Sequence, residues 1–133
     1  MSTRLLIVDD HAGTRDLIKK FLTRPGFTFH ECASGEEAVT AAREFQPHWV
    51  TMDVRMRGAN GFETTKALKL VSPQSRVVIL TGFNEPEFRN LAVAAGATGF
   101  ILKENILALQ LILENPPGAA ALPDQNHFPP PAP

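Results

Sequence analysis

The chain of 133 residues has almost no cysteine, no excess of basic residues and no long apolar run. Its single cysteine, Cys32, cannot form a disulfide within the chain, so the sequence suits a reducing compartment. The 13 basic residues are balanced by 14 acidic ones, which does not favour a nucleic-acid partner. The apolar stretch at residues 5–8 is too short for a signal peptide or a membrane span. These absences predict a cytoplasmic protein that binds neither nucleic acid nor membrane.

The prolines are concentrated at one end of the chain. Seven of the 11 lie within residues 116–133, a segment without apolar periodicity. Such a composition is typical of a disordered or polyproline-like tail. The remaining length is enough for one compact domain with a sizeable core. We therefore predict a single folded domain over residues 1–115, followed by a Pro-rich tail over residues 116–133.

Short apolar runs alternate with longer amphipathic stretches, which is the pattern of βαβ units. The predicted strands are residues 5–8, 27–31, 48–52, 77–80 and 99–102. The predicted helices are residues 12–23, 35–45, 61–70, 85–95 and 104–114, with capping pairs formed by Ser34 with Glu37 and by Asn84 with Glu87. Because three of the strands are apolar nearly throughout, we expect them to be buried on both faces. The sequence thus predicts an α/β fold on a five-stranded parallel sheet.

The last predicted helix is apolar around most of its circumference, and Gln110 is its only polar interior residue. A surface helix normally shows one apolar stripe. Either another part of the chain covers this helix or it is an interaction surface.

Polar residues follow several of the predicted strands. Asp9 and Asp10 follow the first strand, Asp53 follows the third, Thr81 follows the fourth and Lys103 follows the fifth. Because crossovers between parallel strands are right-handed, these positions meet at one edge of the sheet. Singly, each residue has an ordinary explanation as a helix cap, a strand end or a solvated charge. Together, the acids repel one another and require a cation, which Lys103 and a divalent metal ion would supply.

The chemistry of this edge points to one metal and one class of reaction. An oxygen-rich cluster without histidine favours Mg²⁺, which shares its open positions with phosphate oxygens. That combination indicates phosphoryl transfer, with Asp53 at the centre of the sheet as the natural nucleophile. His11 lies beside the acids, but we expect its position in the first helical turn to direct it away from them, which favours a structural role.

Motifs in a characteristic order extend this interpretation. They are residues 5–11 (LLIVDDH), 52–56 (MDVRM) followed by Gly58 and Asn60-Gly61, 78–82 (VILTG), 94–97 (AAGA) and 99–103 (GFILK). In this order and spacing they resemble the receiver domain of bacterial two-component response regulators, over roughly residues 4–114. The resemblance implies a doubly wound, flavodoxin-like (βα)₅ fold with strand order 2-1-3-4-5.

The resemblance also implies roles for the edge residues. Asp53 would accept a phosphoryl group from a phosphohistidine on a sensor histidine kinase or a histidine phosphotransfer protein. Mg²⁺ would be held by Asp10, Asp53 and the backbone carbonyl of Arg55, with Asp9 contacting it mainly through water. Lys103 would pair with Asp53 before the reaction and with the phosphoryl group after it. A receiver catalyses only its own phosphorylation and slow dephosphorylation, so we expect no enzyme activity on another substrate.

The resemblance further implies a conformational switch. Thr81 would move to hydrogen-bond a phosphoryl oxygen, and Phe100 would enter the space that it leaves. The chain departs from the family pattern at Arg57, where proline is usual, so we expect a less rigid loop after Asp53. Position 83 is a bulky Phe.

Arg55 and Phe83 would flank the path of attacking water, which predicts slow loss of the phosphoryl group.

Two alternatives remain open. One is a receiver fragment or adaptor that forms a homodimer through its fourth and fifth helices, although the complete set of acids, Thr81 and Lys103 argues against a degenerate receiver. The other is a phosphohydrolase with an aspartyl nucleophile, which would need a second acid where Arg55 stands.

Overall fold

The computed structural model describes residues 3–114. One parallel sheet has the strand order β2-β1-β3-β6-β7. Its strands are β1 (Thr3–Val8), β2 (Phe27–Cys32), β3 (Trp49–Met52), β6 (Arg76–Thr81) and β7 (Gly99–Leu102). Counted among these five strands alone, the order is 2-1-3-4-5. The predicted fold class and strand order are therefore confirmed.

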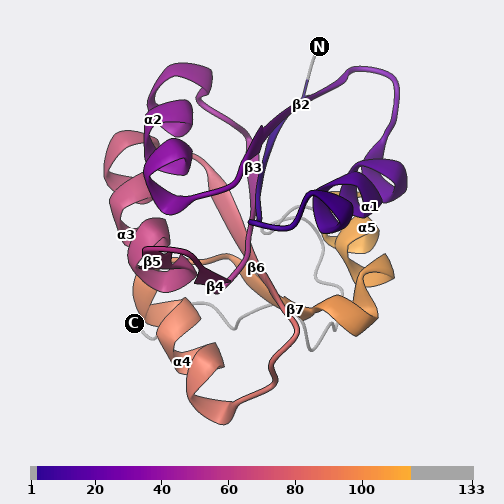
Figure 1. Cartoon of the computed structure of the whole chain (residues 1–133). Coiled ribbons are helices and arrows are strands. Elements are labelled where there is room, and N and C mark those ends of the chain that lie inside the picture. Colours follow the sequence, from indigo (N-terminus) through magenta and orange to yellow (C-terminus); the bar gives the residue numbers. More distant parts are fainter. Residues whose placement is uncertain (1–2, 115–133) are drawn as a thin grey trace, which may run out of the picture.

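Helices cover both faces of the sheet, as a doubly wound fold requires. They are α1 (Ala12–Leu22), α2 (Gly35–Phe45), α3 (Gly61–Val71), α4 (Pro86–Ala95) and α5 (Leu107–Glu114), with a 3₁₀ turn at Lys103–Asn105 before α5. Figure 1 shows α1 and α5 on one face and α2, α3 and α4 on the other. The sheet thus lies between two helical layers.

The core follows from the alternation of side chains along each strand. Leu5 and Ile7 of β1 pack in the cluster that includes Ile18 of α1 and Ile112 of α5. Leu6 and Val8 point the other way, into a second cluster that includes Leu68 of α3. Because both faces are covered, most residues of the central strands β1, β3 and β6 are apolar and buried.

Two of the predicted helix starts can be compared with the structure. The Ser34 hydroxyl accepts the Glu37 N–H at 3.2 Å, and the Glu37 carboxylate accepts the Ala33 N–H at 2.7 Å, so the predicted cap of α2 is confirmed. The predicted Asn84 cap is wrong, because α4 begins at Pro86 and makes no side-chain cap hydrogen bond. Proline is favoured in the first helical turn, since its fixed φ suits the helix and it has no N–H to satisfy.

The apolar helix α5 is partly buried and partly exposed. Leu109 and Ile112 are fully buried, and the Gln110 side chain donates to the Phe21 carbonyl of α1. Leu107 and Leu111 are 60% and 49% exposed. The predicted tail, residues 116–133, lies outside the described residues.

Two further expectations concern the compartment. Cys32 is buried at the end of β2, where burial raises the pKa of its thiol to about 11. Among the described residues, no helix has the length and apolar character needed to cross a bilayer.

Candidate functional site: an acidic pocket at the carboxyl edge of the sheet

The first two acids are positioned by neighbouring strands. Val8 and Met52, the last residues of β1 and β3, are register partners, and the acids Asp9 and Asp53 follow them directly. The Asp53 N–H donates to the Val8 carbonyl at 2.9 Å, and the Asp9 N–H donates to the Cys32 carbonyl at 3.0 Å. These hydrogen bonds continue the sheet pattern by one residue. Both carboxylates are therefore held at the same edge of the sheet.

Lys103 joins these two acids from the end of β7. Its Nζ lies 3.0 Å from Asp9 Oδ2 and 3.3 Å from Asp53 Oδ1. Asp9 and Asp53 are only 1% and 6% exposed. The structure thus brings together three of the residues that the sequence singled out, in a buried group with two negative charges and one positive charge.

This arrangement shifts the protonation equilibria of the group. Burial raises the pKa of Asp53, and the nearby Asp9 carboxylate raises it further, while Lys103 offsets part of the change. Burial alone would lower the pKa of Lys103, but its hydrogen bond to Asp9 and the charges of both acids outweigh burial and raise it. Lys103 therefore stays protonated, and the acids retain an unbalanced negative charge.

Asp10 and His11 complete the acidic side of the pocket. The His11 N–H donates to Asp9 Oδ1 at 2.9 Å, and His11 Nδ1 lies 2.9 Å from Asp10 Oδ1. That second contact lacks hydrogen-bond geometry, so Asp10 Oδ1 is buried without a hydrogen-bond partner. The expectation that His11 points away from the acids is wrong. The imidazole is exposed, and the rotation of its side chain brings Nδ1 back toward Asp10.

The group formed by Asp9, Asp10 and His11 has the spacing of a metal site. One ligand atom from each residue lies within 4.8 Å of the others, and within residues 3–114 no other group of three such side chains does so. Asp53 is not part of this group, although it shares Lys103 with Asp9.

The proposed switch residues are both buried. Thr81 ends β6, and its hydroxyl accepts the Phe83 N–H at 3.2 Å. Phe100 of β7 is fully buried, and the Arg89 guanidinium of α4 lies over its ring, 4.9 Å from the centroid. The threonine hydroxyl is thus bonded within its own turn, and the phenylalanine ring is inside the core.

A short hairpin that the sequence analysis missed follows Asp53. It consists of β4 (Arg55–Met56) and β5 (Ala59–Asn60), joined by Arg57 and Gly58, and Gly58 has a φ of 78°. Glycine tolerates this left-handed conformation. The loop expected after Asp53 thus contains a paired turn, with Arg57 at its tip.

The hairpin contacts the turn after β6. The Arg55 guanidinium lies over the Phe83 ring, 3.9 Å from the centroid, and its Nη2 lies 3.4 Å from Glu85 Oε1. Arg55 stands two residues after Asp53, and Phe83 stands two residues after Thr81. The sequence placed Arg55 and Phe83 beside the pocket, but their mutual contact and the role of Glu85 depend on the fold.

Comparison with known proteins identifies the family. The family model of the response regulator receiver domain matches residues 5–113. The chain belongs to this family. Over 104 residues this receiver is 34% identical to the chemotaxis protein CheY of Thermotoga maritima, a match that covers 77% of the chain and 87% of that protein.

Two further relatives differ in length. The receiver is 36% identical over 120 residues to the response regulator GacA of Pseudomonas protegens, covering 82% of the chain and 54% of that regulator. The crystal structure of Vibrio cholerae CheY4 superposes with a TM-score of 0.78 at 29% identity, covering 86% of the chain and 98% of that structure. The predicted function, a phosphoacceptor receiver of the two-component class, is thereby confirmed at the level of the family. The adaptor and phosphohydrolase alternatives are not favoured.

The acidic pocket of this receiver is suited to a divalent cation. Asp10 Oδ1 is a buried oxygen without a hydrogen-bond partner, and Lys103 balances only part of the negative charge. Carboxylate oxygens are the ligands that hard cations prefer. The donor set therefore fits the type of ion that receivers bind at an acidic pocket.

Proposed function

We propose that Asp53 accepts a phosphoryl group from a phosphohistidine on a sensor histidine kinase or a histidine phosphotransfer protein. The observation that carries this proposal is the contact of Lys103 with Asp9 and Asp53 at the end of the central strand β3. An Asp53 carboxylate oxygen attacks phosphorus, the N–P bond breaks and the imidazole leaves with its electron pair. Asp53 is well placed for this step because it is fixed by the sheet and faces a protonated amine.

Lys103 has a second part in this proposal. Its Nζ contacts both acids, so it can pair with the Asp53 carboxylate before the transfer and with the phosphoryl oxygens after it. The raised pKa keeps the ammonium charged throughout. Lys103 thereby stabilises charge without exchanging a proton.

The proposed metal is Mg²⁺, held by Asp9, Asp10, Asp53 and the backbone carbonyl of Arg55. When bound, it would offset the negative charge of the acids and of the incoming phosphoryl group. The unpartnered Asp10 Oδ1 supports this assignment. His11 Nδ1 lies beside Asp10 Oδ1, so the imidazole must rotate away from Asp10 if all the metal ligands are oxygens.

The proposed switch depends on Thr81 and Phe100. The Thr81 hydroxyl accepts the Phe83 N–H, so its proton is available for a phosphoryl oxygen. When Thr81 turns toward the phosphoryl group, the turn that holds Phe83 and the core around Phe100 must adjust, because a packed interior does not deform continuously. We assign the output of phosphorylation to this rearrangement.

The wider role follows from these assignments. We propose a cytoplasmic signalling protein that acts on no substrate besides its own aspartate and binds neither nucleic acid nor membrane. The lack of a basic excess in the sequence supports this part of the proposal.

The experiment that tests the phosphoacceptor is direct. The full chain is incubated with Mg²⁺ and acetyl phosphate, and its intact mass is recorded. We expect the addition of one phosphoryl group, removable by hydroxylamine, in the wild type and in Asp16→Asn, which changes an exposed acid on α1. Asp53→Asn should show no addition. A wild type without the adduct, or an adduct that persists in Asp53→Asn, contradicts the proposal.

A specific observation also favours a homodimer through α4 and α5. Leu91 and Val93 of α4 are 45% and 53% exposed, and Leu107 of α5 is 60% exposed. These helices precede and follow the edge strand β7, and exposed apolar side chains are typical of interaction surfaces. Sedimentation velocity of the beryllofluoride-treated chain should show a dimer that Val93→Asn and Leu107→Ser weaken. A monomer both with and without beryllofluoride contradicts this second proposal.

A further inference from the structure

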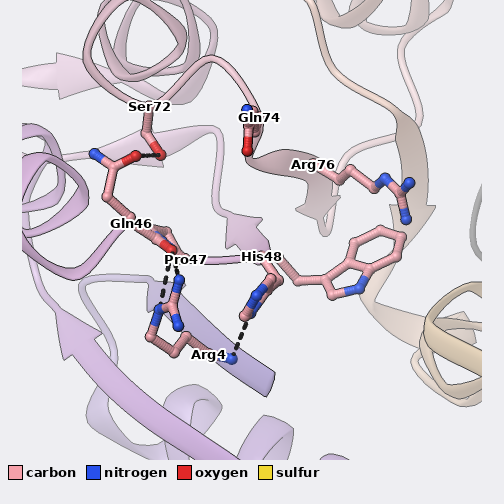
Figure 2. A pocket seen from close by; sticks show the side chains of 8 residues that line it. Arg4, Gln46, Pro47, His48, Ser72, Gln74 and Arg76 are labelled. Atoms are coloured by element: carbon pink, nitrogen blue, oxygen red, sulfur yellow. Dashed lines mark hydrogen bonds between the residues drawn. The ribbon is translucent and has the colours of Figure 1, made fainter. Parts of the chain in front are cut away.

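The edge of the sheet opposite the acidic pocket holds an open cavity of about 360 Å³. It lies at the amino ends of β3 and β6, where Trp49 and Arg76 begin these strands. Figure 2 shows it bordered by Arg4 of β1, by the turn from α2 to β3 and by the turn from α3 to β6. We call it the basic cavity. Its volume is in the range of small-molecule sites.

A rigid frame surrounds the basic cavity. Gln46 adopts a left-handed conformation with φ 46°, and its amide donates to the Val71 carbonyl at 3.1 Å. Arg4 Nε and Nη2 donate to the carbonyls of Phe45 and Gln46 at 2.8 and 2.9 Å. These hydrogen bonds join β1, the end of α2 and the end of α3. The walls of the cavity are therefore held in place before any ligand arrives.

Three polar side chains on this frame have donors to spare. The Arg76 guanidinium lies 5.5 Å from the centroid of the Trp49 ring, and within residues 3–114 it makes no ion pair or side-chain hydrogen bond. The Gln74 amide likewise has no hydrogen-bond partner among the described residues. His48 Nδ1 accepts the Arg4 N–H at 2.9 Å, which leaves Nε2 as the nitrogen that carries the proton in the neutral ring.

The charge of the basic cavity has one sign. Arg4 and Arg76 supply its positive charge, and no lining residue is acidic, although the whole chain carries a net charge of -1. Arg4 is directed at the carbonyls that end α2, a favourable position for a cation. The charge of Arg76 has no such partner. Guanidinium groups pair with the oxygens of phosphate and carboxylate in a planar, two-point geometry.

We propose that the basic cavity binds the phosphate or carboxylate group of a small anion, with Arg76 as the principal cation and with Gln74 and His48 as hydrogen-bond donors. The site is independent of the phosphoacceptor pocket, because it lies at the other end of β3 and β6. A ligand here would contact the strands that lead to Asp53 and Thr81.

The chain supplies its own probe for the first test. Trp49 is the only tryptophan and the chain has no tyrosine, so intrinsic fluorescence reports on the wall of this cavity. The full-length Asp53→Asn variant, in metal-free buffer, is titrated at constant ionic strength with inorganic phosphate, with acetate and with chloride. We expect a saturable change with phosphate or with acetate and none with chloride, and the stronger of the two identifies the ligand group. If neither phosphate nor acetate gives a saturable change, the proposal is overturned.

Variants separate the site from general charge effects. Arg76→Gln removes the charge and should weaken binding about tenfold or more, as expected for a charge-assisted hydrogen bond. Arg43→Gln removes the same charge from an exposed position on α2 outside the cavity, and it should leave the affinity unchanged. Equal affinities for Arg76→Gln and the parent, or equal losses in both variants, overturn the proposal.

A second readout does not depend on the indole, whose fluorescence Arg76→Gln itself can alter. In ¹H–¹⁵N spectra of the full chain, the oxyanion should shift the amides of His48, Gln74 and Arg76, and Gln74→Ala should weaken the effect. Shifts confined to the acidic pocket overturn the proposal. Since the phosphoacceptor is already disabled in the Asp53→Asn background, neither result bears on the function proposed for Asp53.

Discussion

The central carbon of the Arg55 guanidinium lies over the ring of Phe83, 3.9 Å from the ring centroid. The same guanidinium reaches Glu85 at 3.4 Å. The contact joins the hairpin that follows Asp53 to the turn that follows Thr81. The two segments that border the proposed phosphoryl site are thus tied together by a cation–π contact and an ion pair, each worth roughly 1 kcal/mol or less at such exposed positions.

This bridge leads to a prediction about the lifetime of the phosphoryl group. Phe83→Ala removes the ring and opens a path for water, so the phosphorylated chain should lose its phosphoryl group severalfold faster than the wild type. Glu85→Gln removes the ion pair alone and should have a smaller effect. The decay is followed by intact mass after removal of acetyl phosphate. Leu70→Ala, at an exposed apolar position on α3, is the control, and decay at the same rate in Phe83→Ala and this control contradicts the prediction.

A second prediction concerns stability and pH. The pKa of Asp53 is raised in the folded state by burial and by Asp9, so ionisation of Asp53 opposes folding. The cost is absent below the unfolded pKa, grows as the pH rises through the folded pKa and is constant above it. Asp53→Asn should therefore be more stable than the wild type at neutral pH in metal-free buffer, and the gain should shrink toward about pH 4.

Urea denaturation between acidic and neutral pH measures this gain. Asp16→Asn is the control, because Asp16 is exposed and pairs with Lys19 on the surface of α1. It should give no pH-dependent gain. An Asp53→Asn variant that is less stable than the wild type at neutral pH would show that the Lys103 contact outweighs burial.

A third prediction concerns the metal. Mg²⁺ that binds the folded chain alone stabilises it by about 2.7 kcal/mol at a concentration of one hundred times Kd. We expect Mg²⁺ to raise the Tm of the wild type and to raise that of Asp10→Asn much less, because the amide keeps the shape but loses the charge. His11→Gln should retain the increase, since the proposed ligands are all oxygens. An equal increase in Asp10→Asn and the wild type would place the ion elsewhere.

Much of the fold could be predicted because its determinants are local or periodic. The apolar runs of β1, β3 and β6 show burial on both faces, and right-handed crossovers then bring Asp9, Asp53 and Lys103 to one edge. The cap of α2 was readable because Ser34 and Glu37 are three residues apart. The cap of α4 was not, because the position of Pro86 decides where that helix begins.

The features that were missed depend on tertiary contacts or on very short elements. β4 and β5 have two residues each, too few to show a period. The direction of His11 depends on one side-chain rotation beside Asp10. The wall of the basic cavity includes a hydrogen bond between Arg4 and Gln46, which lie 42 residues apart, and no local pattern indicates that contact. The positive φ of Gln46 would also be unexpected for a residue other than glycine.

The last prediction concerns Gly61, the first residue of α3. Its N–H donates to the Val54 carbonyl at 2.8 Å, and a Cβ at this position would lie 2.1 Å from the Asp53 carbonyl oxygen. Because that oxygen belongs to the backbone, Gly61→Ala must displace the segment that carries Asp53. We expect a loss of roughly 1–3 kcal/mol in the free energy of unfolding, together with slower phosphorylation by acetyl phosphate. Gly13→Ala is the matched control in α1, where a Cβ has no neighbour within 4 Å. It should stabilise the chain by about 0.5–1 kcal/mol, because alanine favours the helix, and it should leave phosphorylation unchanged. If Gly61→Ala were as stable and as rapidly phosphorylated as the wild type, the close approach of α3 to Asp53 would not be what positions the phosphoacceptor.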